Sequence, residues 1–193
     1  MNAMNRKGKL LVTGAAGFVG SRFVESCNNL KIPVISVDKS AYFKSRHIHD
    51  DIDFGRIVDR ETFFKEFTAT TLQEEEVTAI VHMGACTDTT EFDVEYLKRI
   101  NLEYTKSLWN LATKAKIPFI YASSAATYGN GDEGYDDNEA SMHKLKPLNP
   151  YGQSKQDFDI WALAEEKKGN HPPAWSGFKF FNVYGYGEDH KGK

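Results

Sequence analysis

A tyrosine and a lysine four positions apart, Tyr151 and Lys155, form the pattern with the clearest chemistry in this sequence. On a helix, residues four apart lie on one face, so these side chains would be neighbours. A phenol with a pKa of ~10 is a weak base at neutral pH, but a neighbouring ammonium stabilises the phenolate and lowers that pKa. Tyr151 could then exchange a proton with an alcohol whose oxygen Ser124 orients. Alone, the pattern also arises as a solvent-facing helix pair.

Three glycines, Gly14, Gly17 and Gly20, follow the apolar run Leu10 to Val12. Apolar strand, glycine turn and helix start in this order are typical of a dinucleotide-binding loop, where glycine lets the chain turn and a phosphate approach. The helix N-terminus adds N–H donors and partial positive charge. A second apolar run ends in Asp38, 18 residues after Gly20, where a carboxylate would bind ribose hydroxyls. A glycine-rich turn without a ligand is the alternative.

Strand and helix patterns alternate along the chain, which predicts an α/β fold: a Rossmann-type doubly wound parallel sheet with helices on both faces. We expect one dinucleotide-binding domain over residues 1–193. The predicted strands are 10–12, 33–38, 77–82, 117–122 and 175–181, and the predicted helices begin after Gly20, near Asp59, at Asp93 and at Tyr151. A loop is expected after Asp38, and residues 130–146 are expected to form a surface loop with little regular structure.

The predicted helix from Asp93 to Lys114 carries apolar residues at helical spacing. This pattern is typical of a core face. The residues assigned to the core on this ground are Leu97, Ile100, Tyr104, Leu108 and Leu111.

Composition narrows the class of function. The net charge of −3 and the scattered basic residues give no case for binding nucleic acid or an anionic membrane. Two cysteines, Cys27 and Cys86, and the lack of a Cys/His cluster argue against a disulfide framework or a metal site. The polar start, Met1 to Lys9, and the lack of a long apolar run favour a cytoplasmic protein.

Three further segments carry a resemblance to a known family. They are Gly84-Ala-Cys-Thr-Asp-Thr-Thr-Glu91, Tyr121-Ala-Ser-Ser-Ala-Ala-Thr-Tyr-Gly129, and Phe180-Phe-Asn-Val-Tyr-Gly185 with Gly187-Glu-Asp-His-Lys-Gly192. With the glycine loop and the Tyr/Lys pair, they make nearly the whole chain resemble the extended short-chain dehydrogenase/reductase superfamily. Within it, the sequence is similar to the ADP-L-glycero-D-manno-heptose 6-epimerases. The Gly-Ala-Cys and His-Lys-Gly parts discriminate best, since the middle segment is shared with sugar 4-epimerases and dehydratases.

The resemblance implies an isomerase that inverts C6 of ADP-D-glycero-D-manno-heptose through a 6-keto sugar, for the lipopolysaccharide core. It implies tightly bound NADP, with NAD possible. Lys44 and Arg60 fall near the family's phosphate positions, and Lys39 stands where the family commonly has Asn, although Asp38 favours a free 2′-hydroxyl. It also implies a homo-oligomer, a pentamer in the resembled family. A C-terminal part of that family, with a last strand and much of the sugar-nucleotide pocket, is expected to be largely absent, since the chain stops at Lys193.

The resemblance also assigns roles to residues. Tyr151, Lys155 and Ser124 would be catalytic, and Lys191 would be a second base on the other side of the sugar, because two sugar orientations need two proton partners. Ser124 and Asn182 would contact the substrate. The candidate cofactor-binding residues are Gly14, Gly17, Phe18, Val19, Gly20, Asp38, Lys39, Lys44, Arg60, Met83, Gly84, Ala85, Cys86, Thr87, Asn101, Lys155, Val183 and Lys191.

Two other readings stay open. The chain could be another nucleotide-sugar enzyme of the same fold, such as a 4-epimerase or a 4,6-dehydratase. A dehydratase would have acidic residues after Ser124, where Ala125 and Ala126 stand. It could instead be a non-catalytic, dinucleotide-sensing Rossmann module, although such modules often lack the Tyr/Lys pair that this chain retains.

Overall fold

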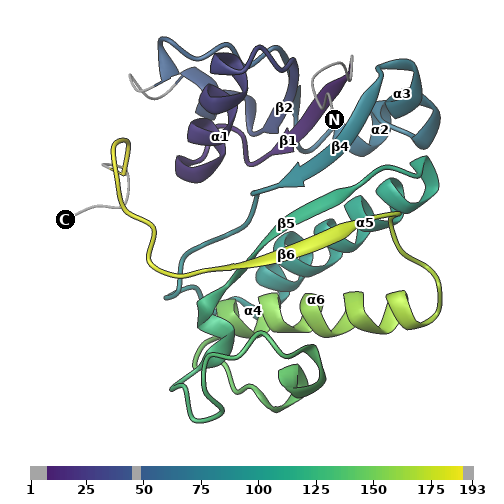
Figure 1. The fold of residues 1–193 in the computed structure, drawn as a ribbon. Coiled ribbons are helices and arrows are strands. Elements are labelled where there is room, and N and C mark those ends of the chain that lie inside the picture. The colour runs from purple at the N-terminus through teal and green to yellow at the C-terminus, as the bar shows by residue number, and fades with distance from the viewer. Residues whose placement is uncertain (1–7, 45–48, 189–193) are drawn as a thin grey trace.

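The computed structural model describes residues 8–44 and 49–188, which form a six-stranded parallel sheet in the order β3-β2-β1-β4-β5-β6 (Figure 1). The strands are β1 (Lys9–Thr13), β2 (Val34–Asp38), β3 (Arg56–Asp59), β4 (Val77–His82), β5 (Phe119–Ser124) and β6 (Trp175–Phe180). The helices are α1 (Phe18–Asn29), α2 (Phe63–Glu66), α3 (Ala69–Glu74), α4 (Val94–Leu97), α5 (Tyr104–Ala115) and α6 (Pro150–Lys167). Shorter turns are η1 (Ser40–Lys44), the π-helical η3 (Lys98–Glu103), η4 (Ala125–Tyr128) and η5 (Glu139–Lys144).

The strand order creates a switch point between β1 and β4. The chain moves outward from β1 to β2 and β3, and then returns to β4 and continues the other way to β6. On one face of the sheet, α1 packs through Val24 and Cys27, and on the other face α2, α3, α5 and α6 pack. This confirms the predicted doubly wound fold. Ligands of such sheets bind at the carboxyl ends of the strands at the switch point, so β1 and β4 mark the expected site.

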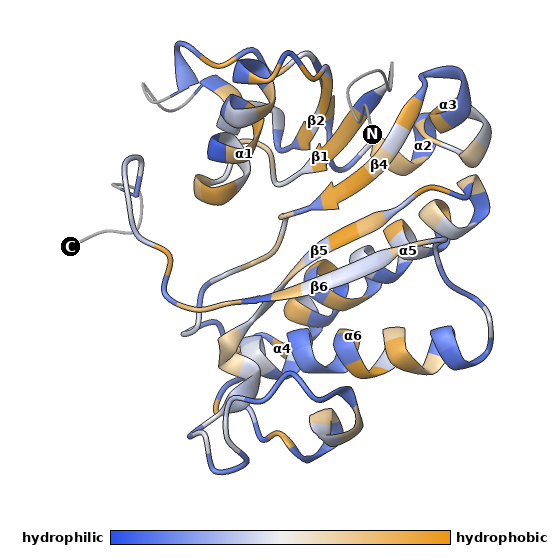
Figure 2. Ribbon diagram, in the orientation of Figure 1, coloured by the Kyte–Doolittle hydropathy of each residue, from blue (hydrophilic) through white to orange (hydrophobic). Residues whose placement is uncertain are grey.

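The apolar strands explain why the sheet forms. All five residues of β2 are buried, and Figure 2 shows β1, β2 and β4 as largely hydrophobic bands, whereas β6 is paler. Trp109 on α5 is fully buried, with its ring 5.0 Å from that of Trp175 on β6 and 6.1 Å from that of Phe158 on α6. Edge-to-face pairs of this kind add about 0.5–1.5 kcal/mol each beyond their burial. They fix α6, which carries the Tyr/Lys pair, against the sheet.

The structure corrects one part of the sequence prediction. Where a loop and then a helix from Asp59 are predicted, residues Arg56–Asp59 form the edge strand β3, and two short helices, α2 and α3, follow. Arg56 and Ile57 are exposed and only Val58 is buried, so β3 lacks the apolar signature of an inner strand. Its pairing with β2, from Ile35 opposite Arg56 onward, holds it in place. Pairing with β2, and not a local apolar pattern, therefore determines the strand conformation of this segment.

Two other predicted segments agree better with the structure. The predicted helix over 93–114 is present as α4, η3 and α5, with a π-helical turn in its middle. The predicted surface loop over 130–146 is mostly irregular but includes η5, capped by the Asn138 side chain. Gln156 on α6 attaches this loop, because its amide donates hydrogen bonds to the carbonyl oxygens of Met142 and Leu145.

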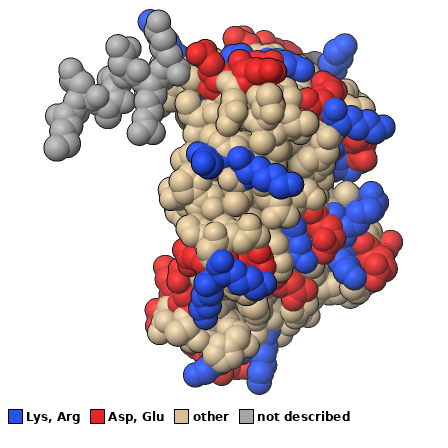
Figure 3. All heavy atoms as spheres, turned by 90° about the vertical axis from the view of Figure 1, so that its right-hand side faces the viewer, with Lys and Arg blue, Asp and Glu red and all other residues tan. Residues whose placement is uncertain are grey.

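Charged side chains of both signs are mixed on the face drawn in Figure 3. At the amino ends of the strands, Glu75 pairs with Lys9 of β1 and with Arg56 of β3. Partly exposed pairs of this kind contribute little, about 0–1 kcal/mol each. Within the ranges that the structure describes, no helix is both long and apolar enough to cross a membrane.

Candidate active site

The turn from β1 into α1 carries glycines at positions where a side chain would collide with neighbouring backbone. Gly14 has a φ of +68°, and a Cβ on it would lie 2.5 Å from the backbone of Gly84, in the loop after β4. A Cβ on Gly20 would lie 2.0 Å from the carbonyl oxygen of Gly14. Gly17 is the N-cap of α1, and no side chain caps this helix among the described residues. An uncapped helix start beside a bare backbone turn is a suitable place for a phosphate.

Asp38, at the end of β2, ties this turn to the next strand. One carboxylate oxygen accepts the Ala16 N–H at 3.0 Å, and the other accepts the Lys39 N–H at 2.8 Å. Arg60 follows β3, and its Nε donates a hydrogen bond to Glu61 at 3.0 Å. Asp38, Lys39 and Arg60 all line one cavity with the glycine turn. The positions predicted for a ribose and a 2′-phosphate therefore lie together.

The loop after β4 is held by Asn101, which is 1% exposed. Its side-chain oxygen accepts the Cys86 N–H at 2.8 Å, and its Nδ2 donates to the Cys86 carbonyl oxygen and to Ser154 Oγ, both at 3.0 Å. Asn101 lies in the π-helical turn η3, and such turns often occur at functional sites because they redirect a side chain. Asn101 thus positions the loop and lies behind it.

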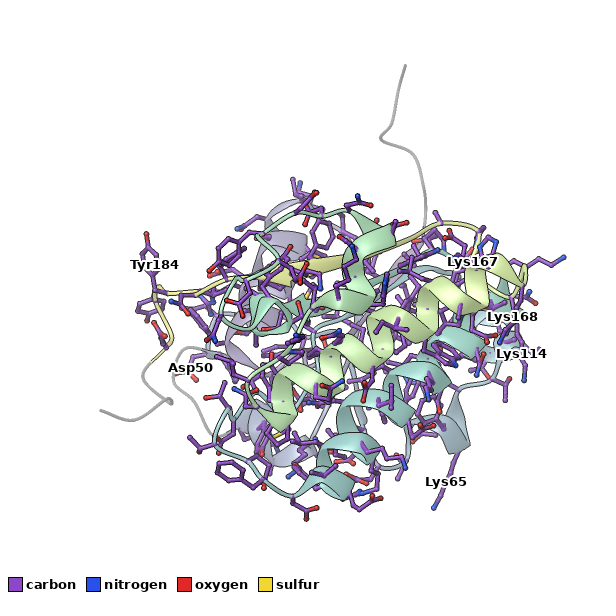
Figure 4. The ribbon with its side chains drawn as sticks, turned by 90° about the horizontal axis from the view of Figure 1, so that it is seen from below. Asp50, Lys65, Lys114, Lys167, Lys168 and Tyr184 are labelled. Carbon is purple, nitrogen blue, oxygen red and sulfur yellow. The ribbon has the colours of Figure 1, made fainter. Side chains whose placement is uncertain are left out.

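Tyr151 and Lys155 begin α6, whose start is well defined. Pro150 occupies the first helical turn, and the Asn149 side-chain oxygen accepts the Gly152 N–H at 2.7 Å. Figure 4 shows α6 in front, with Lys167 and Lys168 at its far end and Tyr184, which follows β6, at the opposite end of the molecule. The first turn of α6 is therefore at the carboxyl ends of the strands. Lys155 reaches β5, where its Nζ donates to the Ala122 carbonyl oxygen at 2.8 Å.

Burial controls the proton affinities of these groups. It raises the pKa of Tyr151, while a hydrogen bond with the Ser124 hydroxyl lowers it and the nearby Cys86 thiol raises it further. The net shift of the Tyr151 pKa is therefore upward, opposite to the lowering predicted from the Tyr/Lys spacing. Burial lowers the pKa of Lys155 to about 8, against the opposing effect of Asp159 and Cys86. Lys155 thus stays mainly an ammonium at neutral pH, and Tyr151 a phenol that is hydrogen-bonded to Ser124.

Most of the predicted site residues line a single cavity of about 910 Å³, a size typical of sites for small ligands. Its predicted members are Gly14, Gly17, Phe18, Val19, Gly20, Asp38, Lys39, Arg60, Met83, Gly84, Ala85, Cys86, Thr87, Ser124, Tyr151, Lys155, Asn182 and Val183. Two predicted residues do not line it: Lys44 is exposed on η1, and Asn101 is buried behind Cys86. Lys191 lies outside the described residues.

Part of the cavity wall consists of residues that the sequence does not predict for the site. Ile100 and Tyr104, assigned to the core, line the cavity with Tyr96 and Arg99 of the same helical segment. Helical spacing identifies a buried face but does not distinguish a core from the wall of a cavity. Phe180 and Phe181, at the end of β6, also belong to the wall. Among residues 8–44 and 49–188, no group of His, Cys, Asp or Glu side chains could hold a metal ion.

Comparison with known sequences identifies the family. Residues 10–193 match the NAD dependent epimerase/dehydratase family. The chain belongs to this family. Within it, the chain is a homologue of ADP-L-glycero-D-manno-heptose-6-epimerases: it is 42% identical to that of Fusobacterium nucleatum subsp. nucleatum over 95% of this chain and 55% of that protein. The enzyme of Brachyspira hyodysenteriae is 40% identical over 95% of this chain and 57% of its own length. This member of the family thus spans little more than half the length of these relatives.

Solved structures agree with this assignment. The crystal structure of Helicobacter pylori ADP-L-glycero-D-manno-heptose-6-epimerase is 27% identical, with a TM-score of 0.75, and the match covers 96% of this chain and 58% of that one. MoeE5, solved in complex with UDP-glucuronic acid and NAD, is 25% identical with a TM-score of 0.74, over 95% and 58% of the two chains. The epimerase family assignment therefore holds for both sequence and fold.

Proposed function

We propose that the protein to which this chain belongs epimerises C6 of ADP-D-glycero-D-manno-heptose by transient oxidation, giving ADP-L-glycero-D-manno-heptose for the lipopolysaccharide core. The observation that carries the proposal is the meeting of Ser124, Tyr151 and Lys155 in the cavity that the glycine turn borders. Homology to the heptose epimerases over 95% of this chain supports the choice of substrate. Because the chain spans little more than half the length of these relatives, the activity is proposed for the whole protein.

The residues around the glycine turn fit a nicotinamide dinucleotide. Gly14, Gly17 and Gly20 keep the backbone bare at this point, and a Cβ at Gly14 or Gly20 would collide with neighbouring backbone. The first turn of α1 would hold the pyrophosphate, Asp38 a ribose, and Met83 to Thr87 the middle of the molecule. When bound, this cofactor supplies reversible hydride acceptance at the sugar carbon.

Each catalytic side chain has a role in that site. Ser124 would orient the C6 oxygen through its hydroxyl, and Tyr151 would exchange the proton of that oxygen. The Lys155 ammonium would stabilise the developing phenolate and hydrogen-bond the nicotinamide ribose. On the family match, Lys191 would be the proton partner of the second sugar orientation, and Asn182 and Val183 would contact the substrate and the cofactor.

We infer NADP as the resident cofactor. The Asp38 carboxylate already accepts two backbone N–H groups, and Lys39 and Arg60 line the same end of the cavity. Fixed donors around the carboxylate and nearby cations make this end more tolerant of a 2′-phosphate. Equilibrium titration with NADP and NAD tests this: preference for NADP that Arg60→Ala reduces is expected, and equal or tighter binding of NAD would overturn it.

The experiment that tests the function uses full-length protein and ADP-D-glycero-D-manno-heptose, with the configuration at C6 followed by NMR. Inversion without added cofactor is expected, because the hydride returns to the sugar within each turnover. Tyr151→Phe should lower turnover by about 10²–10⁴-fold while leaving dinucleotide binding intact, since it removes only the proton-transfer group. Tyr135→Phe, which changes an exposed tyrosine, is the matched control.

Other outcomes select the competing functions. Conversion of a UDP- or GDP-hexose, with the heptose unchanged, would keep the fold and the Tyr/Lys pair but replace the substrate. Dinucleotide binding without turnover of any nucleotide sugar, and no effect of Tyr151→Phe, would favour a sensing module. The proposed homo-oligomer, a pentamer by family resemblance, is tested separately by sedimentation of the same preparation.

A further inference from the structure

Two charged side chains, Asp159 on α6 and Lys179 on β6, are buried behind the candidate active site. Their side chains are 2% and 10% exposed, and Lys179 Nζ lies 2.8 Å from Asp159 Oδ2. Neither residue lines the cavity. Removing charges from water costs several kcal/mol per ion, so a buried pair is weak evidence of a stabilising role. The contacts of the Asp159–Lys179 pair indicate a role other than stabilisation.

The Asp159 carboxylate is fully engaged by its surroundings. Its Oδ1 accepts the Tyr121 hydroxyl at 2.8 Å, and its Oδ2 accepts the Ser123 hydroxyl at 2.7 Å in addition to Lys179. The Lys179 ammonium also donates to Thr127 Oγ1 at 2.7 Å. The pair therefore joins α6, the end of β5, η4 and β6 through side chains alone.

The same strand end carries the candidate catalytic groups. Between Tyr121 and Ser123, which bond to Asp159, the Ala122 carbonyl oxygen accepts the hydrogen bond from Lys155. Thr127 donates to the Ser124 carbonyl oxygen at 2.8 Å. Lys155 precedes Asp159 by four residues on α6, so both side chains leave the same face of the helix.

We propose that Asp159 and Lys179 are positioning residues that hold Ser124 and Lys155 in place and together set the charge state of Lys155. The proposal rests on the proposed function only in taking Lys155 to be catalytic, because the electrostatic coupling itself exists with or without a substrate. Asp159 acts through its negative charge, which favours the ammonium, and Lys179 acts against it. Neither residue touches the ligand cavity.

The groups around Lys155 make this coupling testable. Those coupled to it by charge are His82 on β4, Cys86 in the loop after β4 and Asp159 on α6, and Lys179 on β6 pairs with Asp159. Tyr151 lies one turn before Lys155 on α6. Burial holds the pKa of His82 at about 3, so this imidazole is neutral throughout the range in which Lys155 titrates. Burial lowers the pKa of Lys155 to about 8, and of the two groups that oppose this shift Asp159 has the larger effect. Cys86→Ser tests the contribution of the thiol, the other group that raises the Lys155 pKa.

Opposite charges predict opposite shifts. Asp159→Asn removes a negative charge at nearly constant shape, so the titration midpoint of Lys155 should fall, by roughly one pH unit. Lys179→Met keeps the carboxylate and removes the competing ammonium, so the midpoint should rise by a smaller amount. A purely structural role would not produce shifts of opposite sign, because each variant removes one partner of the same buried pair.

The experiment is an NMR titration of protein labelled with ¹³C at lysine Cε, with the Lys155 signal assigned by its loss in Lys155→Arg. The wild-type midpoint is expected near 8, lower in Asp159→Asn and higher in Lys179→Met. Midpoints that move together, or that do not move, would overturn the proposal. If either single variant does not fold, the double variant Asp159→Asn/Lys179→Met removes both charges, and its midpoint should fall below the wild-type value but less than that of Asp159→Asn alone.

A second readout separates this proposal from the proposed function. In full-length protein, the pH profile of C6 inversion should shift in the same direction as the Lys155 titration for each variant. Shifted titrations without any inversion would uphold the charge pair and reject the epimerase function. Inversion with unshifted titrations would do the reverse.

Discussion

The two sides of the cavity recognise a ligand by different means. The first, β1–α1–β2, presents backbone: at Gly14 and Gly20 a side chain would collide with neighbouring backbone. The second, β5–α6–β6, depends on buried charged side chains, with Lys155 and Asp159 each 5% exposed or less. A phosphate can be bound by any backbone that comes close enough, whereas proton transfer needs particular functional groups at particular distances. Adding atoms should therefore disrupt the first side, and removing charges should disrupt the second.

The largest effect is expected from adding one carbon to the first side. Gly14→Ala places a methyl group 2.5 Å from the Gly84 backbone at a φ of +68°. Strain and overlap together should reduce the free energy of unfolding by roughly 3–5 kcal/mol. Urea denaturation measures this loss, and dinucleotide titration should show weakened binding in the fraction that still folds.

Gly134→Ala separates the two causes. Gly134 has a φ of +78°, similar to that of Gly14, but a Cβ there meets nothing within 4 Å. This variant should lose only about 1–2 kcal/mol, the cost of a left-handed conformation for a residue with a side chain. If both variants lost the same amount, the collision with the β4 loop would contribute nothing, and the contrast between the two sides would fail.

His82 lies on β4, the strand between the two sides, and gives the next effect. Its Nδ1 hydrogen-bonds the Thr13 hydroxyl of β1, and its Nε2 lies 2.9 Å from the Thr105 hydroxyl of α5. Burial and the Lys155 charge lower its pKa from 6.5 to about 3 in the folded state. Between these values the unfolded chain binds a proton that the native state does not, so stability falls on acidification. From pH 7 to pH 5 the loss should be about 2 kcal/mol.

Denaturation curves at pH 7, 6 and 5 test this, above the range in which carboxylates titrate. His82→Gln should lose stability at pH 7 but remove most of this pH dependence, because its amide has no proton to gain. Exposed His143→Gln is the control and should keep the wild-type slope. An unchanged slope in His82→Gln would show that other groups bind the proton.

The same contrast explains which parts of the site and the fold can be predicted from the sequence. The glycine turn is local, so Gly14, Gly17 and Gly20 identify it within a few residues. The site residues Ser124 and Tyr151 were recognisable only by combining segments that are far apart. The Asp159–Lys179 pair gave no signal, because its partners on β5 and β6 are determined by strand pairing. Strand β3 escaped prediction for a similar reason, since its pairing with β2 replaces an apolar pattern.

The smallest effect concerns how the two sides begin their helices. At α6 the Asn149 side-chain oxygen takes the Gly152 N–H, whereas Gly17 at the start of α1 has no side chain to do so. Asn149→Ala should cost about 1 kcal/mol in urea denaturation, and Asn149→Asp, which keeps the oxygen, should cost much less. The loss should loosen the first turn of α6, where Tyr151 lies.

Amide hydrogen exchange extends this prediction to both helices. In Asn149→Ala the Gly152 amide should exchange faster than in wild type, while Asn149→Asp should retain protection. In α1, the Val19 and Gly20 amides should gain protection only when a dinucleotide is added, since a phosphate would take the place that Asn149 fills at α6. Strong protection of these α1 amides before any dinucleotide is added would mean that the protein itself satisfies them. The first side would then not be a backbone site that depends on its ligand, and the difference between the two helix starts would carry no functional meaning.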